Sequence, residues 1–285
     1  MIVVTGATGN IGRPLVGQLL AEGAEVRALT RDPRRAHLPA GAEVVAAQLG
    51  PGSEERLAEL CRGARVLYLH LSATQGASIA SLAAAAVGAG VRRIVLNSSI
   101  SVEYGEDGGP IGRIHQEAEQ GVRDSGAEWC FVRGGMYATN ALAWAPEIRA
   151  TGVVRGAHPG AVASPVHEAD LAAVAARALL DEKGEHTGQA YAVTGPANLT
   201  MADQVAEIAR AIGRPEVRFE QVPVPQAVAA MAAQGIPEQM AEALIAFFGR
   251  TVGTNPPISD AVEHVTGRPP RTFAQWAHDH AQDFR

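Results

Sequence analysis

The sequence predicts a doubly wound α/β fold, in which helices cover both faces of a parallel β-sheet. Three observations carry this prediction. Strand-like and helix-like segments alternate through the first half of the chain, as in parallel sheets joined by crossover helices. The strand segments are almost continuously apolar, which is typical of strands buried on both faces. A glycine-rich turn joins the first strand segment to the first helix segment.

Each strand is expected where a short run of β-branched and aliphatic residues ends at turn residues. In chain order these runs cover residues 2–5, 25–30, 43–49, 66–71, 92–97 and 128–132. Helices are expected between them, where apolar residues recur at helical spacing. These segments cover residues 14–21, 54–61, 78–89 and 113–124.

Beyond about residue 139 the alternation loosens, and the elements are predicted from their caps. Asp170 is expected to cap a helix over residues 170–180, followed by a strand over 190–193. Thr200, with Asp203 three residues later, predicts a helix start, and Thr272 predicts another before residues 273–282. Two further helices are expected over residues 225–234 and 237–248, because each begins with Pro and is followed by Gly.

Composition excludes several classes of protein. Hydrophobic residues make up 47% and charged residues 19%, which is too apolar for a disordered chain. The net charge of −6 argues against nucleic acid as the main partner, because phosphate binding needs a basic face. Two distant cysteines predict neither a disulfide framework nor a zinc site, and His278 and His280 lack a third metal ligand. No run reaches the ~20 apolar residues of a membrane span, so a cytoplasmic protein is expected.

The glycine-rich turn GATGNIG covers residues 6–12 and predicts a dinucleotide site. Gly6 permits the tight turn, Gly9 lets the backbone approach a pyrophosphate, and Gly12 allows the helix to pack closely on the strand. The start of the following helix supplies amide donors and the positive end of the helix dipole. The expected cofactor contacts in this turn are Gly6, Thr8, Gly9, Asn10, Ile11 and Gly12.

The end of the second strand predicts which dinucleotide binds. An NAD-selective site places a carboxylate near this position, whereas a guanidinium suits the 2′-phosphate of NADP(H). Arg31 stands there, with Arg35 just beyond it, and both are expected to contact NADP(H). The carboxylate of Asp32 beside it would weaken the preference for NADP(H) over NAD(H). The simpler alternative is that Arg31 is a solvated surface residue.

Several segments together resemble the NmrA-like branch of the atypical short-chain dehydrogenase/reductases. They cover residues 115–140, 165–172, 191–200 and 266–276, and the GxxGxxG spacing agrees with them. The resemblance spans nearly the whole chain. It implies one Rossmann-type NAD(P)-binding unit over residues 1–285, in which residues 135–165 and 196–285 form a smaller substrate-binding or lid region.

The sequence departs from this family at its proton-delivery residues. Typical short-chain dehydrogenase/reductases use YxxxK, in which the tyrosine donates a proton and the lysine lowers its pKa. The chain contains one lysine, Lys183, and it lies far from the cofactor segments. Tyr104 is followed four residues later by Gly108, and His115 is preceded four residues earlier by Ile111. The usual pair is therefore absent.

Two functional interpretations follow. In the first, the protein is an NADPH-dependent reductase whose acceptor stabilises negative charge itself, since general acid catalysis is worth about 10²–10⁴ in rate. Such acceptors include polycyclic aromatic ketones, as in tailoring ketoreductases of angucyclinone biosynthesis, and quinones, whose reductases in this branch carry a stretch similar to His115 and Glu119. In the second, the protein is a non-catalytic NADP(H)-binding regulator.

Three residues are candidate proton donors. Ser99 lies where the catalytic serine of this superfamily lies, Tyr104 stands in a Gly/Asp-rich loop, and His115 is expected at a helix start. Each has a plain structural alternative: a strand-end cap, a solvated loop residue and a surface histidine.

The remaining predicted contacts follow the strand ends, where α/β sheets bind ligands. Leu71 and Ser72 are expected beside the adenosine and ribose, and Ser98 beside the cofactor. The resemblance places Gly134 near the nicotinamide.

Three further residues are expected near a small aromatic or quinone-like substrate. The resemblance places Tyr137 and Asn140 there. Phe247 belongs to the helix pair 225–248, which is either an apolar lid or ordinary core packing. The sequence makes no prediction about the oligomeric state.

Overall fold

The computed structural model describes residues 1–285, which form two compact units. The larger unit contains Met1–Gly135, Glu168–Val193 and Asp260–Pro269. The smaller unit contains Met136–His167, Thr194–Ser259 and Pro270–Arg285. Each unit is therefore assembled from three separate stretches of the chain.

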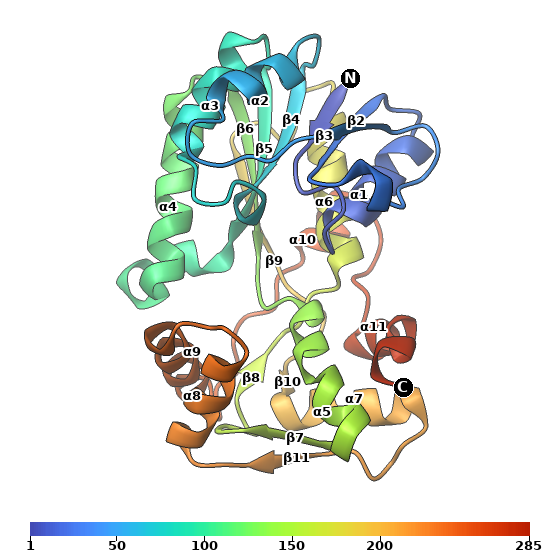
Figure 1. Cartoon of the computed structure of the whole chain (residues 1–285), viewed down its shortest axis with the longest axis vertical. Helices are drawn as coiled ribbons and strands as arrows, with labels where there is room; N and C mark the ends of the chain where they lie inside the picture. Colours follow the sequence, from blue (N-terminus) through green and yellow to red (C-terminus); the bar gives the residue numbers. More distant parts are fainter. The chain divides into compact units, whose positions relative to one another are not determined.

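A seven-stranded parallel sheet forms the centre of the larger unit (Figure 1). Its strands run in the order β3-β2-β1-β4-β5-β6-β9. The strand bounds are β1 Ile2–Val4, β2 Val26–Thr30, β3 Glu43–Ala46, β4 Val66–His70, β5 Arg93–Ser99, β6 Glu128–Gly134 and β9 Gln189–Val193. The order reverses between β1 and β4, and ligands bind at such a reversal in open α/β sheets. The predicted doubly wound Rossmann fold is confirmed.

Helices cover both faces of this sheet, with α2, α3 and α4 on one face and α1 and α6 on the other (Figure 1). The bounds are α1 Gly12–Ala21, α2 Glu54–Cys61, α3 Ile79–Gly88, α4 Gly109–Asp124, α6 Glu168–Leu180 and α10 Ala261–Thr266. Three short 3₁₀ segments complete the unit: η1 Pro33–Arg35, η2 Leu71–Ala73 and η3 Ile100–Gly108. No helix of the protein combines the length and the apolar character that crossing a membrane requires.

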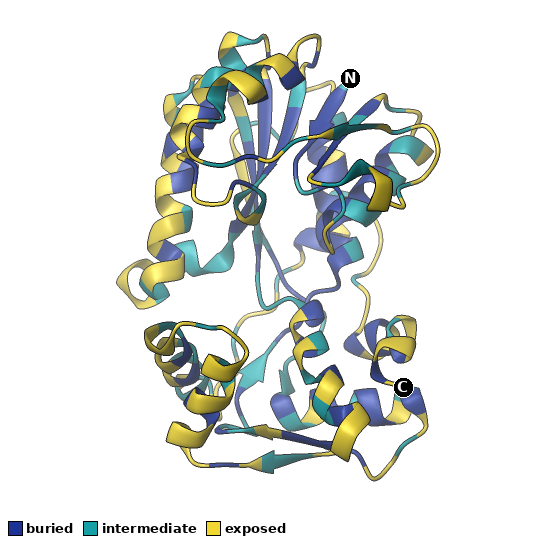
Figure 2. Cartoon of the chain, in the orientation of Figure 1, coloured by how far each residue is buried: buried dark blue, intermediate teal, exposed yellow.

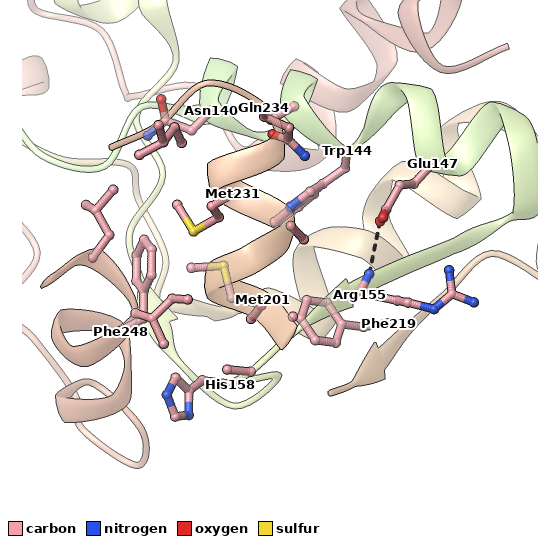
Figure 3. A pocket seen from close by; sticks show the side chains of 18 of the residues that line it. Asn140, Trp144, Glu147, Arg155, His158, Met201, Phe219, Met231, Gln234 and Phe248 are labelled. Carbon is pink, nitrogen blue, oxygen red and sulfur yellow. Dashed lines mark hydrogen bonds between the residues drawn. The ribbon is translucent and has the colours of Figure 1, made fainter. Parts of the chain in front are cut away.

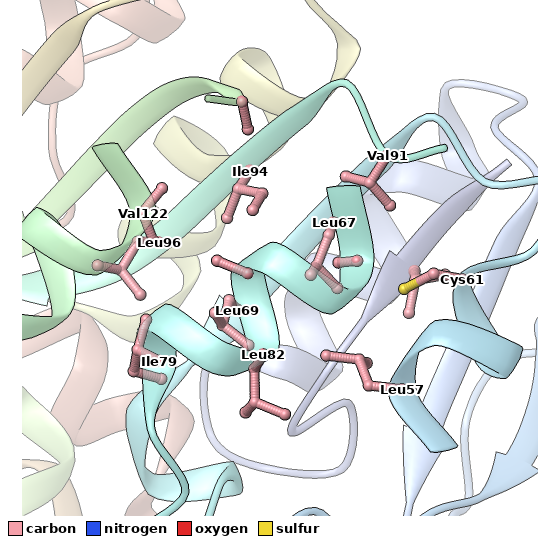
Figure 4. Packing of buried hydrophobic residues seen from close by; sticks show 14 of the residues in the cluster. Leu57, Cys61, Leu67, Leu69, Ile79, Leu82, Val91, Ile94, Leu96 and Val122 are labelled. Atoms are coloured by element: carbon pink, nitrogen blue, oxygen red, sulfur yellow. The ribbon is translucent and has the colours of Figure 1, made fainter. Parts of the chain in front are cut away.

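One core cluster of the larger unit lies between the sheet and helices α2 to α4 (Figure 4). Leu67 and Ile94 of neighbouring strands pack there against Leu57 and Leu82 of the helices. The central strands β1, β4 and β5 are buried along most of their length, whereas the edge strands β3 and β9 and the outer helix faces are more exposed (Figure 2). Cys61 belongs to this core, and burial raises the pKa of its thiol to about 12. The apolar runs of the sequence therefore mark the sheet correctly.

The smaller unit combines two short sheets with helices. Strands β8 and β10 pair antiparallel, and β7 and β11 pair parallel. The strand bounds are β7 Val153–Gly156, β8 Val162–Ala163, β10 Leu199–Thr200 and β11 Arg218–Gln221. The helices are η4 Ala138–Trp144, α5 Ala145–Thr151, α7 Met201–Ile212, α8 Val224–Ala233, α9 Glu238–Arg250, α11 Phe273–Asp279 and η5 Ala281–Phe284. Trp276 and Phe284 are fully buried in its core.

Several predicted boundaries need correction. Helix α4 begins at Gly109 rather than at residue 113, so His115 lies in its second turn and not at its start. Helix α6 begins at Glu168, which places Asp170 inside the first turn rather than at the cap. Six elements were not predicted from the sequence: β7, β8, β10, β11, α5 and α10. Both threonine caps are confirmed, because Thr200 and Thr272 each form a capping box.

Candidate functional site

Two turns at the carboxyl edge of the large sheet are tied together by Thr5, the residue that follows β1. Its Oγ1 donates a hydrogen bond to the carbonyl of Tyr68 at 3.1 Å and accepts one from the backbone N–H of His70 at 3.0 Å. Tyr68 and His70 belong to β4. Thr5 therefore fixes the turns that leave β1 and β4, the two strands at which the strand order reverses.

The glycine turn has the shape of a phosphate cradle. Gly6 has a φ of +63°, a backbone conformation that favours glycine. A Cβ added to Gly12 would lie 2.1 Å from the carbonyl oxygen of Gly6, and one added to Gly9 would lie 3.2 Å from the same oxygen. Helix α1 therefore begins directly against the turn, and the tip at Gly9 and Asn10 is exposed.

The start of α1 is left open for an anion. The first turn carries no acidic residue and no side chain caps it. Its amide groups and positive dipole end are available to a phosphate group. Ile11 is 4% exposed, so only its backbone can serve a ligand, whereas Thr8 is half-buried at the rim. These features fit the pyrophosphate of a dinucleotide.

Arginines surround the loop that follows β2. Arg31 and Arg35 are exposed, while Asp32 accepts a hydrogen bond from the backbone N–H of Arg34 at 3.0 Å and is thereby engaged locally. Arg13 was not predicted to belong to this site, and its guanidinium donates to the carbonyl of Ala36 at 2.9 Å. A basic residue directly after the last glycine of the turn was the available signal.

Arg13 also joins this loop to the glycine turn. Its guanidinium donates to the carbonyl of His37 at 2.6 Å and to that of Thr8 at 3.4 Å. It therefore holds the loop of Arg31 in place beside the phosphate cradle, with positive charge concentrated on that side.

His70, at the end of β4, is held neutral. Burial, and then the charge of the nearby His115, lowers its pKa from the usual 6.5 to about 4. Its Nδ1 accepts a hydrogen bond from the backbone N–H of Ser72 at 3.2 Å and lies 2.9 Å from the Ser72 hydroxyl. Because Nδ1 is an acceptor, the proton resides on Nε2. Ser72 is exposed and Leu71 half-buried, both in the turn η2.

A buried ion pair supports the ends of β5 and β6. Glu119 of α4 is 1% exposed and receives hydrogen bonds from the Arg133 guanidinium at 2.8 and 2.7 Å. The Ser98 hydroxyl donates to the same carboxylate at 2.7 Å, and Arg123 lies 3.2 Å from it. Ser98 is fully buried and its hydroxyl supports Glu119, and its expected contact with a cofactor stays a prediction. Gly134 continues β6 as a buried neighbour of Ser99.

The three candidate proton donors lie at the end of β5 and in the two elements that follow it, η3 and α4. The Ser99 hydroxyl caps η3 by accepting from the backbone N–H of Ser101 at 3.2 Å. Tyr104 is 42% exposed, and burial, then the charge of Glu103, raises its pKa, so the phenol stays protonated. Burial lowers the pKa of His115 although Glu119 opposes this, and the His115 Nδ1 is buried without a hydrogen-bond partner. His115 is thus a neutral imidazole within electrostatic range of His70.

The expected substrate residues lie in the smaller unit, which contains a cavity of about 520 Å³ (Figure 3). Asn140 lines this cavity, as does Phe248. Phe247, one position earlier on α9, lies outside the lining and faces the Arg250 guanidinium, which is 5.7 Å from its ring centre. Tyr137 also lies outside the lining, in a bridge with Val166.

Lys183 is remote from all of these groups. It is exposed in the segment between α6 and β9 and pairs with Glu185 at 3.9 Å. That segment precedes a parallel strand and so lies at the amino edge of the sheet, opposite the glycine turn. The site therefore has no ammonium group from this chain.

Comparisons with known proteins agree with the geometry. The NmrA-like family matches residues 1–268. The (4-alkanoyl-5-oxo-2,5-dihydrofuran-3-yl)methyl phosphate reductase of Streptomyces griseus is 40% identical over 100% of this chain and 99% of its own length. The NAD(P)H azoreductase of Xenophilus azovorans is 35% identical over 100% and 99%.

A solved structure extends the likeness to three dimensions. The NADPH-dependent quinone oxidoreductase QOR2 of Escherichia coli, in complex with NADPH, is 26% identical, with a TM-score of 0.80 over 98% of this chain and 99% of that one. Fold, glycine turn and sequence thus agree, and this chain belongs to the NmrA-like family of atypical short-chain dehydrogenase/reductases.

Proposed function

We propose that this protein is an NADPH-dependent reductase whose hydride acceptor is a conjugated carbonyl compound. The broader statement, that the chain is an NAD(P)H-dependent oxidoreductase, rests on its family and on relatives named as reductases. The finer candidate is a polycyclic aromatic ketone, such as an intermediate of aromatic polyketide tailoring. The second candidate is a quinone, favoured by the azoreductase and quinone oxidoreductase relatives.

One observation carries the proposal: the glycine cradle is intact while the lysine of the usual proton-delivery pair is missing. The only lysine lies at the opposite edge of the sheet. Without an ammonium group, the Tyr104 phenol keeps a raised pKa and is a weak acid. Losing strong general acid catalysis costs about 10²–10⁴ in rate. An acceptor that spreads the added negative charge over a conjugated system tolerates this loss.

The residues that would hold NADP(H) follow from the cradle. The backbone amides of residues 8–12 bind the pyrophosphate, and a Cβ at Gly12 would strike the Gly6 carbonyl oxygen and distort the turn that presents them. Arg31, with Arg35 beside it, binds the 2′-phosphate, as Asp32 is engaged by Arg34. Leu71 and Ser72 border the adenosine and ribose, and Gly134 borders the nicotinamide. The bound nucleotide supplies the hydride.

The proton then comes from solvent, from a hydroxyl group of the substrate itself, or from one of three side chains. Ser99, Tyr104 and His115 are the candidates. Tyr104 is protonated at neutral pH, and neutral His115 donates from whichever ring nitrogen carries its proton. Glu119 and Arg133 are positioning residues, because their ion pair fixes α4 and the end of β6.

The test is NADPH oxidation at 340 nm with hydroxyanthraquinones, simple quinones and angucyclinones. We expect turnover with at least one of these conjugated acceptors and none with an isolated aliphatic ketone. Tight NADPH binding without oxidation by any compound would overturn the proposal in favour of a non-catalytic regulator.

Alanine variants then identify the proton donor. Ser99→Ala, Tyr104→Ala and His115→Ala are compared under the same conditions. The donor is the residue whose loss lowers kcat by tenfold or more and leaves the Kd for NADPH unchanged. Full turnover in all three variants assigns the proton to solvent or substrate.

A further inference from the structure

Arg13 is a positive charge in the first turn of a helix. It is the second residue of α1 and follows Gly12 directly. The start of a helix is the positive end of its dipole, so a cation is unfavourable there. The same turn carries no acidic residue that would offset the charge. A residue that opposes its own helix in this way points to a role outside that helix.

The Arg13 guanidinium joins the glycine turn to the arginine loop, residues 31–37. Its Nη1 donates to the carbonyl of Ala36 at 2.9 Å and to that of His37 at 2.6 Å. Its Nη2 donates to the carbonyl of Thr8, in the glycine turn, at 3.4 Å. The two nitrogens of a rigid guanidinium reach both segments at once, whereas a lysine would offer a single nitrogen.

The arginine loop has few other attachments. Asp32 caps the short helix η1 inside the loop, and the side chain of Ala36 is buried. The hydrogen bonds that tie the loop to other parts of the chain all come from Arg13. His37 has a φ of +45°, which residues other than glycine rarely adopt. Such a backbone persists only where its surroundings hold it, and the bond from Arg13 does so.

The loop presents two cations that are not engaged elsewhere. Arg31 and Arg35 are exposed, and neither side chain forms a hydrogen bond or an ion pair with the chain. Both guanidinium groups are therefore available to a phosphate group. Binding is tighter when the groups that meet a ligand are already in place, because less conformational entropy is lost. The affinity of the loop for a phosphate group thus depends on what fixes its backbone.

We propose that Arg13 determines the preference for NADP(H) over NAD(H) by holding the arginine loop in position, without itself contacting the 2′-phosphate. Arg13 is a positioning residue that acts through Arg31. This inference rests on the contact between Arg31 and the 2′-phosphate proposed above. All the residues involved belong to the larger unit.

The adenosine half of the nucleotide tests this inference by itself. The probes are 2′,5′-ADP and 5′-AMP, which differ only in the 2′-phosphate, and isothermal titration calorimetry gives the Kd of each. Neither probe contains nicotinamide, so the result is independent of hydride transfer. The unmodified protein should bind 2′,5′-ADP at least tenfold more tightly than 5′-AMP. Equal affinities would overturn both this inference and the Arg31 contact.

Two substitutions of Arg13 separate position from charge. Arg13→Lys keeps the charge and Arg13→Met removes it, and both lose the bridge between the two segments. Each should lower the preference for 2′,5′-ADP at least fivefold while 5′-AMP binds within threefold of normal, which also shows that the site is folded. A preference retained in Arg13→Lys would overturn the inference, because charge alone would then suffice. The control Arg177→Met removes an exposed arginine of α6 and should leave the preference within twofold.

A double-mutant cycle distinguishes failure of this inference from failure of the Arg31 contact. Arg31→Ala should weaken 2′,5′-ADP at least tenfold in the unmodified protein. In the Arg13→Met background it should weaken it no more than threefold, because Arg31 is no longer held in place there. Equal losses in the two backgrounds would show that the residues act independently, which would overturn the role of Arg13 and retain that of Arg31.

Discussion

Replacing Glu119 by glutamine should lower the free energy of unfolding by about 3–5 kcal/mol, the usual cost of breaking a buried ion pair from one side. The structure supports a value of this size. Glu119 is 1% exposed, and its Oε2 accepts from Arg133 at 2.7 Å and from Arg123 at 3.2 Å. An amide NH₂ in place of that oxygen would face two donors. Losing two hydrogen bonds to charged groups, at about 1.5–3 kcal/mol each, gives ~3–6 kcal/mol.

The other partner of Arg133 cannot replace Glu119. Glu103 lies 3.2 Å from the Arg133 guanidinium but its side chain is 40% exposed, and exposed pairs contribute little. Urea unfolding followed by circular dichroism measures the loss. Glu117→Gln, an exposed position on the same helix, is the control and should change stability by less than ~0.5 kcal/mol. A Glu119→Gln protein as stable as that control would refute the reasoning.

Three further predictions concern the nucleotide site. Gly12→Ala should weaken NADPH binding more than tenfold, because the new Cβ would lie 2.1 Å from a backbone oxygen. The control Gly17→Ala has open space around it, so it should bind NADPH normally and gain up to ~1 kcal/mol in the free energy of unfolding. Fluorescence titration measures binding and urea unfolding measures stability, and normal NADPH binding by Gly12→Ala would contradict the predicted phosphate cradle. Arg31→Ala should weaken NADPH at least tenfold more than NADH, and an equal loss for both nucleotides would disprove the 2′-phosphate contact. Folded His70 stays neutral down to about pH 4, whereas an unfolded histidine takes up a proton near pH 6.5. The free energy of unfolding should therefore decrease as the pH is lowered from 6.5 to 4, by at most ~1.4 kcal/mol per pH unit. His70→Gln should reduce that slope and exposed His278→Gln should not; a slope that is the same in both variants would show that His70 does not cause it.

Features that depend on local chemistry were predictable from the sequence. The glycine turn and both capping boxes involve residues only a few positions apart, and the local contacts of these residues determine the backbone conformation there. The start of α4 was missed because Gly105, Gly108 and Gly109 suggest a loop. In the structure α4 begins at Gly109, which takes a positive φ, and Pro110 follows in the first turn, where a missing N–H costs nothing.

Features that depend on distant parts of the chain were not predictable. Strands β7 and β11 are four residues each and pair across more than sixty residues, so neither carries a periodic signal of its own. The Glu119–Arg133 pair likewise joins a helix to a strand. The choice of Phe248 over Phe247 at the cavity turns on one helical position, about 100° of rotation, which the sequence leaves open.

The three-part composition of each unit has a consequence for engineering. A fragment cut after Gly135 would lack β9 and α6. Strand β6 would then be an unpaired edge strand, and the sheet face that α6 covers would be exposed to water. A hybrid that takes the whole smaller unit from a relative would therefore need three inserts at once, joined to the rest of the chain at five junctions.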